Sequence, residues 1–431
     1  MSKRASEKPR APSSAWANRI ARTVLSSPLL SPPDPLKQQR CISAIVAHDE
    51  DDDRLHVLSI GEGTKFMSSA CSSSVLKDMH SEVLAFRGFK RFLWESITIS
   101  LLPSSTSSPP SPSILSKSSE SSSTQPSAQL LPAQYVLSPN ITIHMYTSSS
   151  PCGDSVVRRW GNNKSDPFLC PAAGSPMWIE STPHGLLNAQ AIKQGQFALL
   201  SKGSYMDIDG GPCPPPPAFV PPPPGTHYTP TIPYTHPPSP APHTCSDKIL
   251  LRNMLGLQGL LLTHLIPTPI HLTSITIGRK YSNLHSRRAL CCRSSSYRTK
   301  RGKKVAPPVS SASAFDVNHP AIIGTSVKAD ESLTDAPASF KSQCRVGWAG
   351  CSGAPASVED VDGDSGRLVD GEVSKVSSSA FADLAAKFFV NQTLTLSEMK
   401  QKSPGWARKE ALMNNHELFK MYAWTRRATP S

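Results

Sequence analysis

Long runs of proline and serine interrupt the apolar segments of this chain, and they limit the kind of core it can build. Residues 102–133 are rich in serine and proline, and residues 205–244 contain PCPPPPAFVPPPPG and YTHPPSPAPH. Polyproline runs are extended rather than packed, and serine-rich stretches bury too little apolar surface to order their backbone. With the basic, serine-rich residues 293–313, these stretches form three expected disordered insertions. A folded core must therefore be assembled from segments that are far apart in the sequence.

Between the insertions, periodic apolar patterns predict helices and strands. The stretch from Cys41 to Lys65 is typical of two strands joined by an acidic turn at residues 49–53. The clearest helix covers residues 79–99, where apolar residues recur every three or four positions. The remaining expected elements are a strand at 141–149, a helix at 245–266, a strand at 272–278 and a basic helical segment at 379–427. This alternation is compatible with an α/β fold.

We divide the chain into a basic N-terminal tail, residues 1–39, and one domain, residues 40–431. The tail contains one short amphipathic helix at residues 15–25, and its first residues show no apolar signal segment. Ten cysteines without such a segment indicate reduced thiols, and hence a cytoplasmic or nuclear protein. Because the tail is rich in arginine and serine and nearly free of acid, a mitochondrial presequence is an alternative.

The net charge of +13 and the pI of about 9.3 favour a polyanionic partner, since each cation near a phosphate releases counterions. A solvated basic surface explains the same charge equally well. No apolar run approaches the ~18 residues of a membrane span. We expect no membrane as a partner.

A histidine and a glutamate, His80 and Glu82, open the predicted helix in KDMHSEVLAFRGFK. Residues two apart on a helix flank point to opposite sides, so these two converge only at the N-terminal tip. There His80 would bind a metal while Glu82 stays close to it but does not bind it. An ordinary histidine at a helix start is the simpler interpretation of His80 taken alone.

The pair Pro151 and Cys152 follows the strand at 141–149. With His80 and Glu82 it matches the zinc-deaminase signature H-x-E with P-C-x-x-C, except that Ser155 stands where the second cysteine is expected. In such a site zinc takes three protein ligands and one water, and supplies hydroxide near neutral pH. The carboxylate beside it carries protons to the ring nitrogen and to the leaving ammonia.

Six sequence blocks resemble the tRNA-type and double-stranded-RNA-type adenosine deaminases. In chain order they are GEGTK, HSEVLAFRGFKRFL, PCGDS, CSDKILLRNMLGLQGLLLTHLI, NLHSRRA and NHP. In that family the second cysteine lies far downstream, in a Cys-Ser-Asp-Lys motif that opens a helix, which here is Cys245. The resemblance implies zinc on His80, Cys152 and Cys245, with Glu82 as the proton shuttle. It also implies the cytidine-deaminase-like fold, a three-layer α/β/α arrangement with a mixed central sheet.

The resemblance assigns further residues. Thr64 and Lys65 would lie at the rim of the nucleotide pocket, and Asp78 and Lys248 would surround the metal ligands, although Lys248 is also explained as a solvated helix-start lysine. The family buries inositol hexakisphosphate, for which the candidate residues are Arg87, Lys248, Arg367, Lys400, Lys409, Trp424 and Arg427. Phe86 and Leu251 stand where the family usually has arginines, and Leu396 and Trp406 near its usual tyrosines. A basic amphipathic tail with solvated charges is the alternative.

The resemblance implies an enzyme that hydrolyses adenosine to inosine in RNA, with no DNA partner. Because the ordered segments are all assigned to the deaminase, tRNA near the anticodon is the expected substrate rather than a long duplex. A catalytically degenerate RNA-binding or scaffold protein, whose proline-rich runs bind SH3- or WW-type domains, is one alternative. A deaminase of free nucleosides is another.

A proline-rich run replaces the short basic loop, of Lys-Pro-Gly-Arg type, that the family usually carries before Cys245. Either an insertion has replaced that loop, or residues 161–244 are translated intron or lie in a wrong reading frame.

Overall fold

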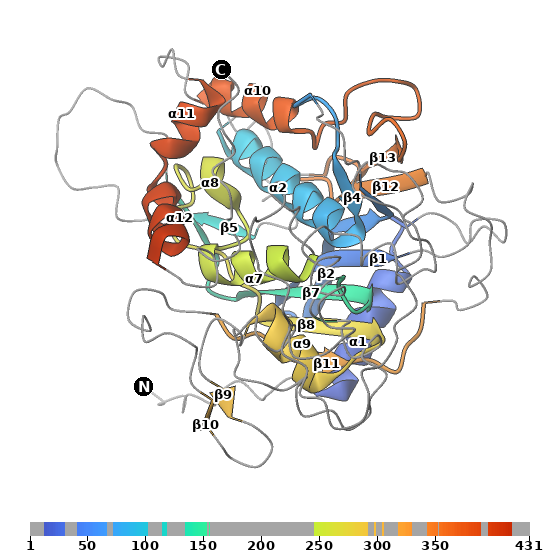
Figure 1. Ribbon diagram of the computed structural model, residues 1–431. Coiled ribbons are helices and arrows are strands. Elements are labelled where there is room, and N and C mark those ends of the chain that lie inside the picture. The colour runs from blue at the N-terminus through green and yellow to red at the C-terminus, as the bar shows by residue number, and fades with distance from the viewer. Residues whose placement is uncertain are drawn as a thin grey trace, which may run out of the picture.

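The computed structural model describes thirteen stretches of the chain, drawn as coloured ribbon in Figure 1. These are residues 13–30, 41–66, 72–101, 114–118, 134–152, 155, 245–291, 297–298, 304–305, 318–329, 343–351, 353–388 and 395–415. The expected insertion at 205–244, with its proline-rich runs, lies outside the described residues, as does most of those at 102–133 and 293–313.

Within the described residues, seven strands form one central sheet. Their order is β11 (Ala321–Gly324), β8 (Ser274–Arg279), β7 (Ile141–Ser149), β1 (Ile42–Asp49), β2 (Arg54–Glu62), β12 (Gln343–Trp348) and β13 (Ser357–Asp362). The strands β11, β8 and β7 run parallel, and the remaining pairs are antiparallel. The expectation of a mixed central sheet is therefore confirmed.

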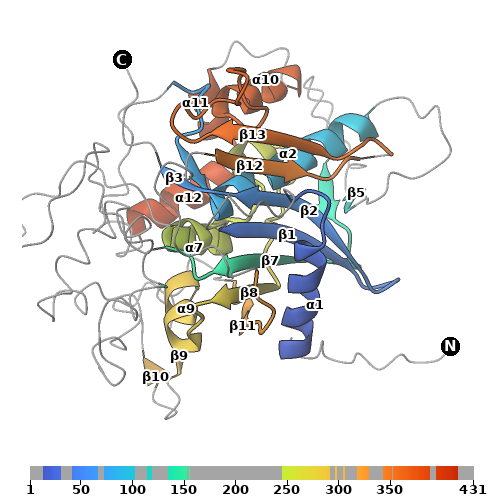
Figure 2. The ribbon, with the colours of Figure 1, turned by 90° about the vertical axis from the view of Figure 1, so that its right-hand side faces the viewer.

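Helices cover both faces of the sheet (Figure 2). Side chains alternate between the faces of a strand. Accordingly Ser59 of β2 bonds to α2 (Ser81–Ser100), whereas the next residue, Ile60, joins the apolar cluster beneath α1 (Ser14–Leu25). The apolar face of α1, with Ala17, Ile20, Ala21 and Val24 fully buried, thus packs on the sheet although it precedes residue 40.

Helix α2 lies very close to β2. A Cβ atom added at Gly61 would stand 2.2 Å from the carbonyl oxygen of Ser81 and 2.6 Å from the amide nitrogen of Ala85. Glycine at this position therefore allows the first turn of α2 to rest directly on the strand. This contact fixes where the helix begins.

The remaining helices lie along the chain after the long insertion. They are α7 (Cys245–Leu255), α8 (Gly259–Leu262), α9 (Asn283–Leu290), α10 (Ser378–Phe388), α11 (Leu396–Gln401) and α12 (Pro404–Asn415). The continuous helix expected at 245–266 is instead two, because Gly256 adopts a left-handed conformation (φ 93°) that ends α7. In the part of the chain that is described, no helix is both long and apolar enough to cross a bilayer.

Short two-stranded pairs complete the structure. They are β3 (Thr64–Phe66) with β4 (Asp78–His80), β5 (Leu115–Lys117) with β6 (Tyr135–Leu137), and β9 (Tyr297–Arg298) with β10 (Lys304–Val305). The expectation of disorder throughout 102–133 is wrong for residues 114–118. Ile114 is buried in the main core, which offsets the cost of ordering its neighbours.

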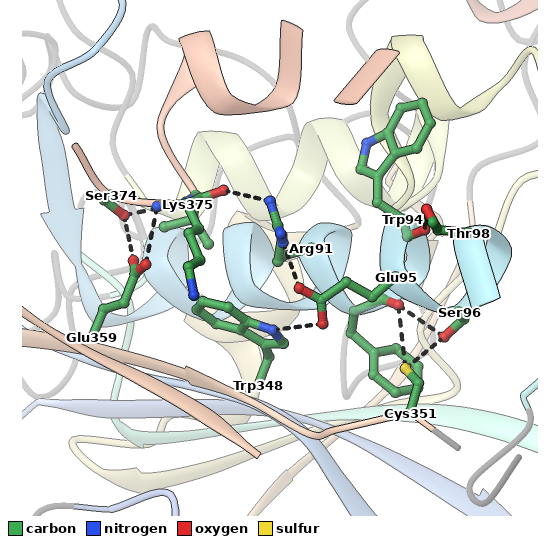
Figure 3. A network of polar contacts seen from close by, with 12 residues as sticks. Arg91, Trp94, Glu95, Ser96, Thr98, Trp348, Cys351, Glu359, Ser374 and Lys375 are labelled. Atoms are coloured by element: carbon green, nitrogen blue, oxygen red, sulfur yellow. Dashed lines mark hydrogen bonds and ion pairs between the residues drawn. The ribbon is translucent and has the colours of Figure 1, made fainter. Parts of the chain in front are cut away.

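A polar network fastens the β12–β13 region to α2 (Figure 3). Glu95 of α2 accepts a hydrogen bond from Trp348 Nε1 at 3.0 Å and pairs with Arg91 at 2.6 Å. Glu359 of β13 accepts bonds from the Ser374 hydroxyl and the Lys375 amide at 2.7 and 3.0 Å. The network lies beside the middle of α2, away from its first turn, so it supports the helix that carries the candidate site without being part of it.

Candidate active site

The strand β4 ends at His80, and α2 begins at the next residue. His80 has extended backbone (φ −64°, ψ 143°) and caps the helix without a side-chain bond to its amides. Its ring is therefore available for other contacts, and Nδ1 lies 2.7 Å from Asp78 Oδ1. Glu82 occupies the first turn of α2, where the helix dipole favours a negative charge. Both side chains are buried. His80 and Glu82 thus both lie at the start of α2, and their charges interact.

The two candidate cysteines meet although the long insertion separates them in the sequence. Cys152 follows the carboxyl end of β7, and Cys245 is the first residue of α7. The Cys245 amide donates to Cys152 Sγ at 3.2 Å, and the Ser246 amide and hydroxyl both donate to the Cys152 carbonyl, at 3.0 and 2.8 Å. The start of α7 is therefore fastened to the turn after β7.

Charges around the histidine are strongly coupled. Asp78 accepts from His80 through one oxygen and pairs with Lys248 through the other. Burial alone would lower the pKa of His80, but the Asp78 carboxylate outweighs it and raises that pKa to about 9. Burial would likewise raise the pKa of Asp78, yet Lys248 and His80 hold it well below its ordinary value. Asp78 thus orients the ring, and Lys248 keeps Asp78 ionised.

The pKa values of the two cysteine thiols also depend on these neighbours. A hydrogen bond with Cys245 lowers the pKa of Cys152, helped by the charge of His80, whereas the same contact and burial raise the pKa of Cys245. Coulombic interactions with Glu82 reach His80 and both cysteines. The four candidate residues therefore lie in one corner of the molecule, where Cys152 is half-buried and the other three are buried.

The donor set of this corner suits zinc. His80 Nε2 is a buried atom with no hydrogen-bond partner, while Nδ1 is held by Asp78. This is the arrangement of a metal-binding imidazole, whose other nitrogen is bonded to a carboxylate, and nitrogen and thiolate sulfur are preferred zinc ligands. As they stand, no three His, Cys, Asp or Glu side chains of the described residues form a group that could hold a metal ion. Zinc is accordingly a proposal below.

Two further candidate residues border this corner. In the β3–β4 pair Thr64 lies opposite His80, and Lys65 lies opposite Met79. Lys65 Nζ is 2.9 Å from Asp364 Oδ1, in the turn after β13. The Leu76 amide bonds to the Gly366 carbonyl at 2.8 Å, which ties that turn to the segment before β4. Asp364 is a contact that the sequence did not indicate.

A group of four cations, which we call the cation cluster, comes from three helices. It consists of Arg87 and Lys90 of α2, Arg252 of α7 and Lys400 of α11. Burial, and then the charges of Arg87, Arg252 and Lys400, lower the pKa of Lys90 well below its ordinary value. Burial and Arg87 lower the pKa of Arg252 to about 10. All four residues are half-buried, so solvent screens this repulsion only in part.

Sequence reasoning missed two members of the cation cluster, Lys90 and Arg252. Arg252 Cζ lies 4.1 Å from the centroid of the Phe86 ring. Phe86 and Leu251 stand where the family usually has arginines, and Arg252 therefore places a cation next to both positions. The usable signal was the position of Arg252 directly after Leu251, on the helix predicted at 245–266. For Lys90 the signal was its spacing of three residues from Arg87.

Two other expected anion-binding residues have contacts on their own elements. Arg367 donates to the Gly371 carbonyl within its own turn, at 3.2 Å. Lys409 Nζ lies 4.9 Å from the Trp406 ring centroid on α12. Trp424 and Arg427 lie outside the described residues.

Comparison with known proteins agrees with this geometry. Residues 59–423 match the model of the adenosine-deaminase (editase) domain. Over 346 residues the chain is 27% identical to the mouse (Mus musculus) double-stranded RNA-specific adenosine deaminase, covering 79% of this chain and 25% of that protein. Over 297 residues it is 25% identical to the mouse tRNA-specific adenosine deaminase 1, covering 54% and 56%. The mouse double-stranded RNA-specific editase B2 is 27% identical over 244 residues, covering 56% and 27%.

The matched region thus spans about a quarter of the double-stranded-RNA-specific relatives and just over half of the tRNA-specific one. The family model, by contrast, covers most of this chain. The chain therefore belongs to the adenosine-deaminase (editase) domain family.

Proposed function

We propose that this chain hydrolyses adenosine to inosine in RNA with the help of zinc. The observation that carries the proposal is the buried His80 Nε2 without a hydrogen-bond partner, which lies within electrostatic reach of Glu82 and of Cys152, the residue that contacts Cys245. His80 Nε2 and the two sulfur atoms would hold the metal. When bound, zinc would supply a water-derived nucleophile at neutral pH.

Glu82 would move the protons of the reaction. Water adds at carbon 6 of the adenine ring, and the Glu82 carboxylate takes a proton from that water and delivers it to the ring nitrogen. A second proton goes to the amino group, which leaves as ammonia, so adenine and water become hypoxanthine and ammonia. Because carbon 6 is out of reach inside a base stack, the target nucleotide must be extruded or already unpaired. Thr64 and Lys65, beside His80, would contact the nucleotide.

The proposed substrate class within RNA is tRNA, near the anticodon. This choice follows from the assignment of all ordered segments to the deaminase, while the comparisons match both classes, at 25% identity over 54% of this chain for the tRNA-specific protein and 27% over 79% for the double-stranded-RNA-specific one. Identity is similar for both relatives, so the test must offer both substrates.

We also propose inositol hexakisphosphate, or a similar polyphosphate, as the anion of the cation cluster. Arg87, Lys90, Arg252 and Lys400 come from three helices, and their repulsion lowers the pKa of Lys90. Bound phosphates would remove this repulsion and bring the three helices together. Lys248, the other residue expected here, instead pairs with Asp78.

The test is to measure inosine directly. The purified chain, with its zinc content determined, is incubated separately with tRNA and with duplex RNA, and inosine is detected by sequencing. Glu82→Gln should lower the rate at least ~100-fold because it removes the general acid and base. Glu359→Gln is the matched control. Glu359 is 7% exposed and Glu82 is 6% exposed, but Glu359 belongs to the structural network of Figure 3 and not to the candidate site. Equal inosine from wild type and Glu82→Gln would end the proposal.

A further inference from the structure

Two buried serines form a hydrogen-bonded chain that ends at Glu82. The Ser43 hydroxyl of β1 lies 2.9 Å from the Ser81 hydroxyl, and Ser81 Oγ lies 3.2 Å from Glu82 Oε2. Both serines have no exposed surface, and Glu82 is 6% exposed. Within the described residues, Ser81 is the one group that donates a hydrogen bond to this carboxylate.

The direction of the chain follows from what each group can donate. An ionised carboxylate only accepts, so the single hydroxyl hydrogen of Ser81 points to Glu82. The lone pairs of Ser81 Oγ then accept the hydrogen of Ser43. Each hydroxyl in such a chain polarises the next, and the low dielectric of the interior strengthens both bonds.

The backbone holds this chain rigidly. Ser43 lies in a central strand, between β2 and β7. Ser81 is the first residue of α2, and its carbonyl packs against Gly61 with no space for a Cβ atom. The backbone of Ser81 is therefore fixed relative to β2, and hence to Ser43 in the neighbouring strand β1.

We infer that Ser81, supported by Ser43, is a positioning residue that holds the Glu82 carboxylate in the orientation used for proton transfer. The inference rests on the proposed function for its kinetic part, while the hydrogen bond itself can be tested without any activity. Ser81 acts through Glu82 and contacts no substrate. The main consequence is on kcat, because an orientation that matters in the transition state changes kcat more than KM.

The first experiment is spectroscopic. The infrared difference between wild type and Glu82→Gln isolates the carboxylate bands of Glu82. Ser81→Ala should shift these bands because it removes the donor, and Ser43→Ala should shift them less, in the same direction. Ser59→Ala is the matched control. Ser59 is equally buried and also bonds to α2, through the Ala85 carbonyl at 2.7 Å, but does not reach Glu82. Unshifted bands in Ser81→Ala would overturn the inference, whether or not the protein deaminates RNA.

The second experiment is a double-mutant cycle on deamination. Loss of a hydrogen bond to a charged group should lower kcat about tenfold in Ser81→Ala, with KM and zinc content near wild type. Adding Ser43→Ala to Ser81→Ala should cost nothing further, because Ser43 acts only through Ser81. Ser43→Thr keeps the hydroxyl, and a strand position tolerates its β-branched side chain. Its kcat should therefore be higher than that of Ser43→Ala and close to that of the wild type. Additive losses, or a fall in KM alone, would contradict the inference, whereas an inactive wild type would contradict the proposed function instead.

Discussion

Replacement of Arg252 by methionine should have opposite effects on stability without and with a bound polyanion. Arg252 projects from α7 over the Phe86 ring, close to Arg87 and Lys90. Methionine keeps an unbranched side chain of similar length and makes favourable contacts with aromatic rings. The substitution therefore removes the charge while it preserves much of the packing.

The magnitude follows from the pKa of Arg252, which burial and then Arg87 lower from 12.5 to about 10. For a base, a lowered pKa means that the folded state disfavours the charged form. At neutral pH the group is charged in both states, so the full cost of about 3 kcal/mol is present, and it declines only above pH 10. Loss of the guanidinium contact with Phe86 costs about 1 kcal/mol. Arg252→Met should therefore stabilise the anion-free protein by about 2 kcal/mol.

With a polyphosphate bound, the sign reverses. At a ligand concentration 100 times its Kd, binding stabilises the folded state by about 2.7 kcal/mol, and weaker binding by the variant removes part of that gain. The assay is chemical denaturation of protein refolded without polyphosphate, with and without added inositol hexakisphosphate. Arg22→Met, which removes an exposed arginine of α1, is the control and should change neither curve. Destabilisation of the anion-free protein by Arg252→Met would refute the argument from repulsion.

Three further substitutions test the packing. Gly61→Ala should prevent folding or separate α2 from β2, because its Cβ would stand 2.2 Å from the Ser81 carbonyl, and a native-like circular dichroism melt would contradict this. Trp348→Phe should cost about 1–3 kcal/mol in denaturant because Glu95 loses a buried donor, and an unchanged midpoint would show that the bond is not made. Burial and the charge of His48 lower the pKa of His144 to about 3, so stability should fall by up to ~1.4 kcal/mol per unit as pH drops below 6.5, since the unfolded state then binds the extra proton. His144→Gln should flatten that slope.

The elements that the sequence predicts well are those with strong local periodicity. The strand at 141–149 is observed at the expected bounds, and the helix expected at 79–99 begins two residues later because β4 extends through His80. The helix expected at 245–266 fails at Gly256, where tertiary contacts favour a left-handed residue over continued helix. Ile114 shows the opposite error, since one buried side chain orders a short stretch inside a polar composition.

The candidate site likewise contains some contacts that the sequence predicts and others that it does not. The convergence of His80 and Glu82 at a helix tip follows from their spacing, because it concerns adjacent residues. The contact between Cys152 and Cys245 does not, since nothing local links two cysteines across a long insertion, and only the family resemblance paired them. The approach of Ser43 to Ser81, and of Asp364 to Lys65, depends on strand order, which the sequence did not specify.

The two charged sites of the molecule share the same pair of helices. Helix α2 carries Glu82 in its first turn and Arg87 in its second, and α7 carries Cys245 and Lys248 before Arg252. Arg252 also donates to the Lys248 carbonyl at 3.3 Å, one turn earlier, which links the cation cluster to the lysine that pairs with Asp78. Because α2 and α7 are rigid over these few turns, a change in the distance between them at the cation cluster must also change the distance between His80 and Cys245. We therefore expect that neutralising the cation cluster also changes the spacing of the proposed zinc ligands His80 and Cys245.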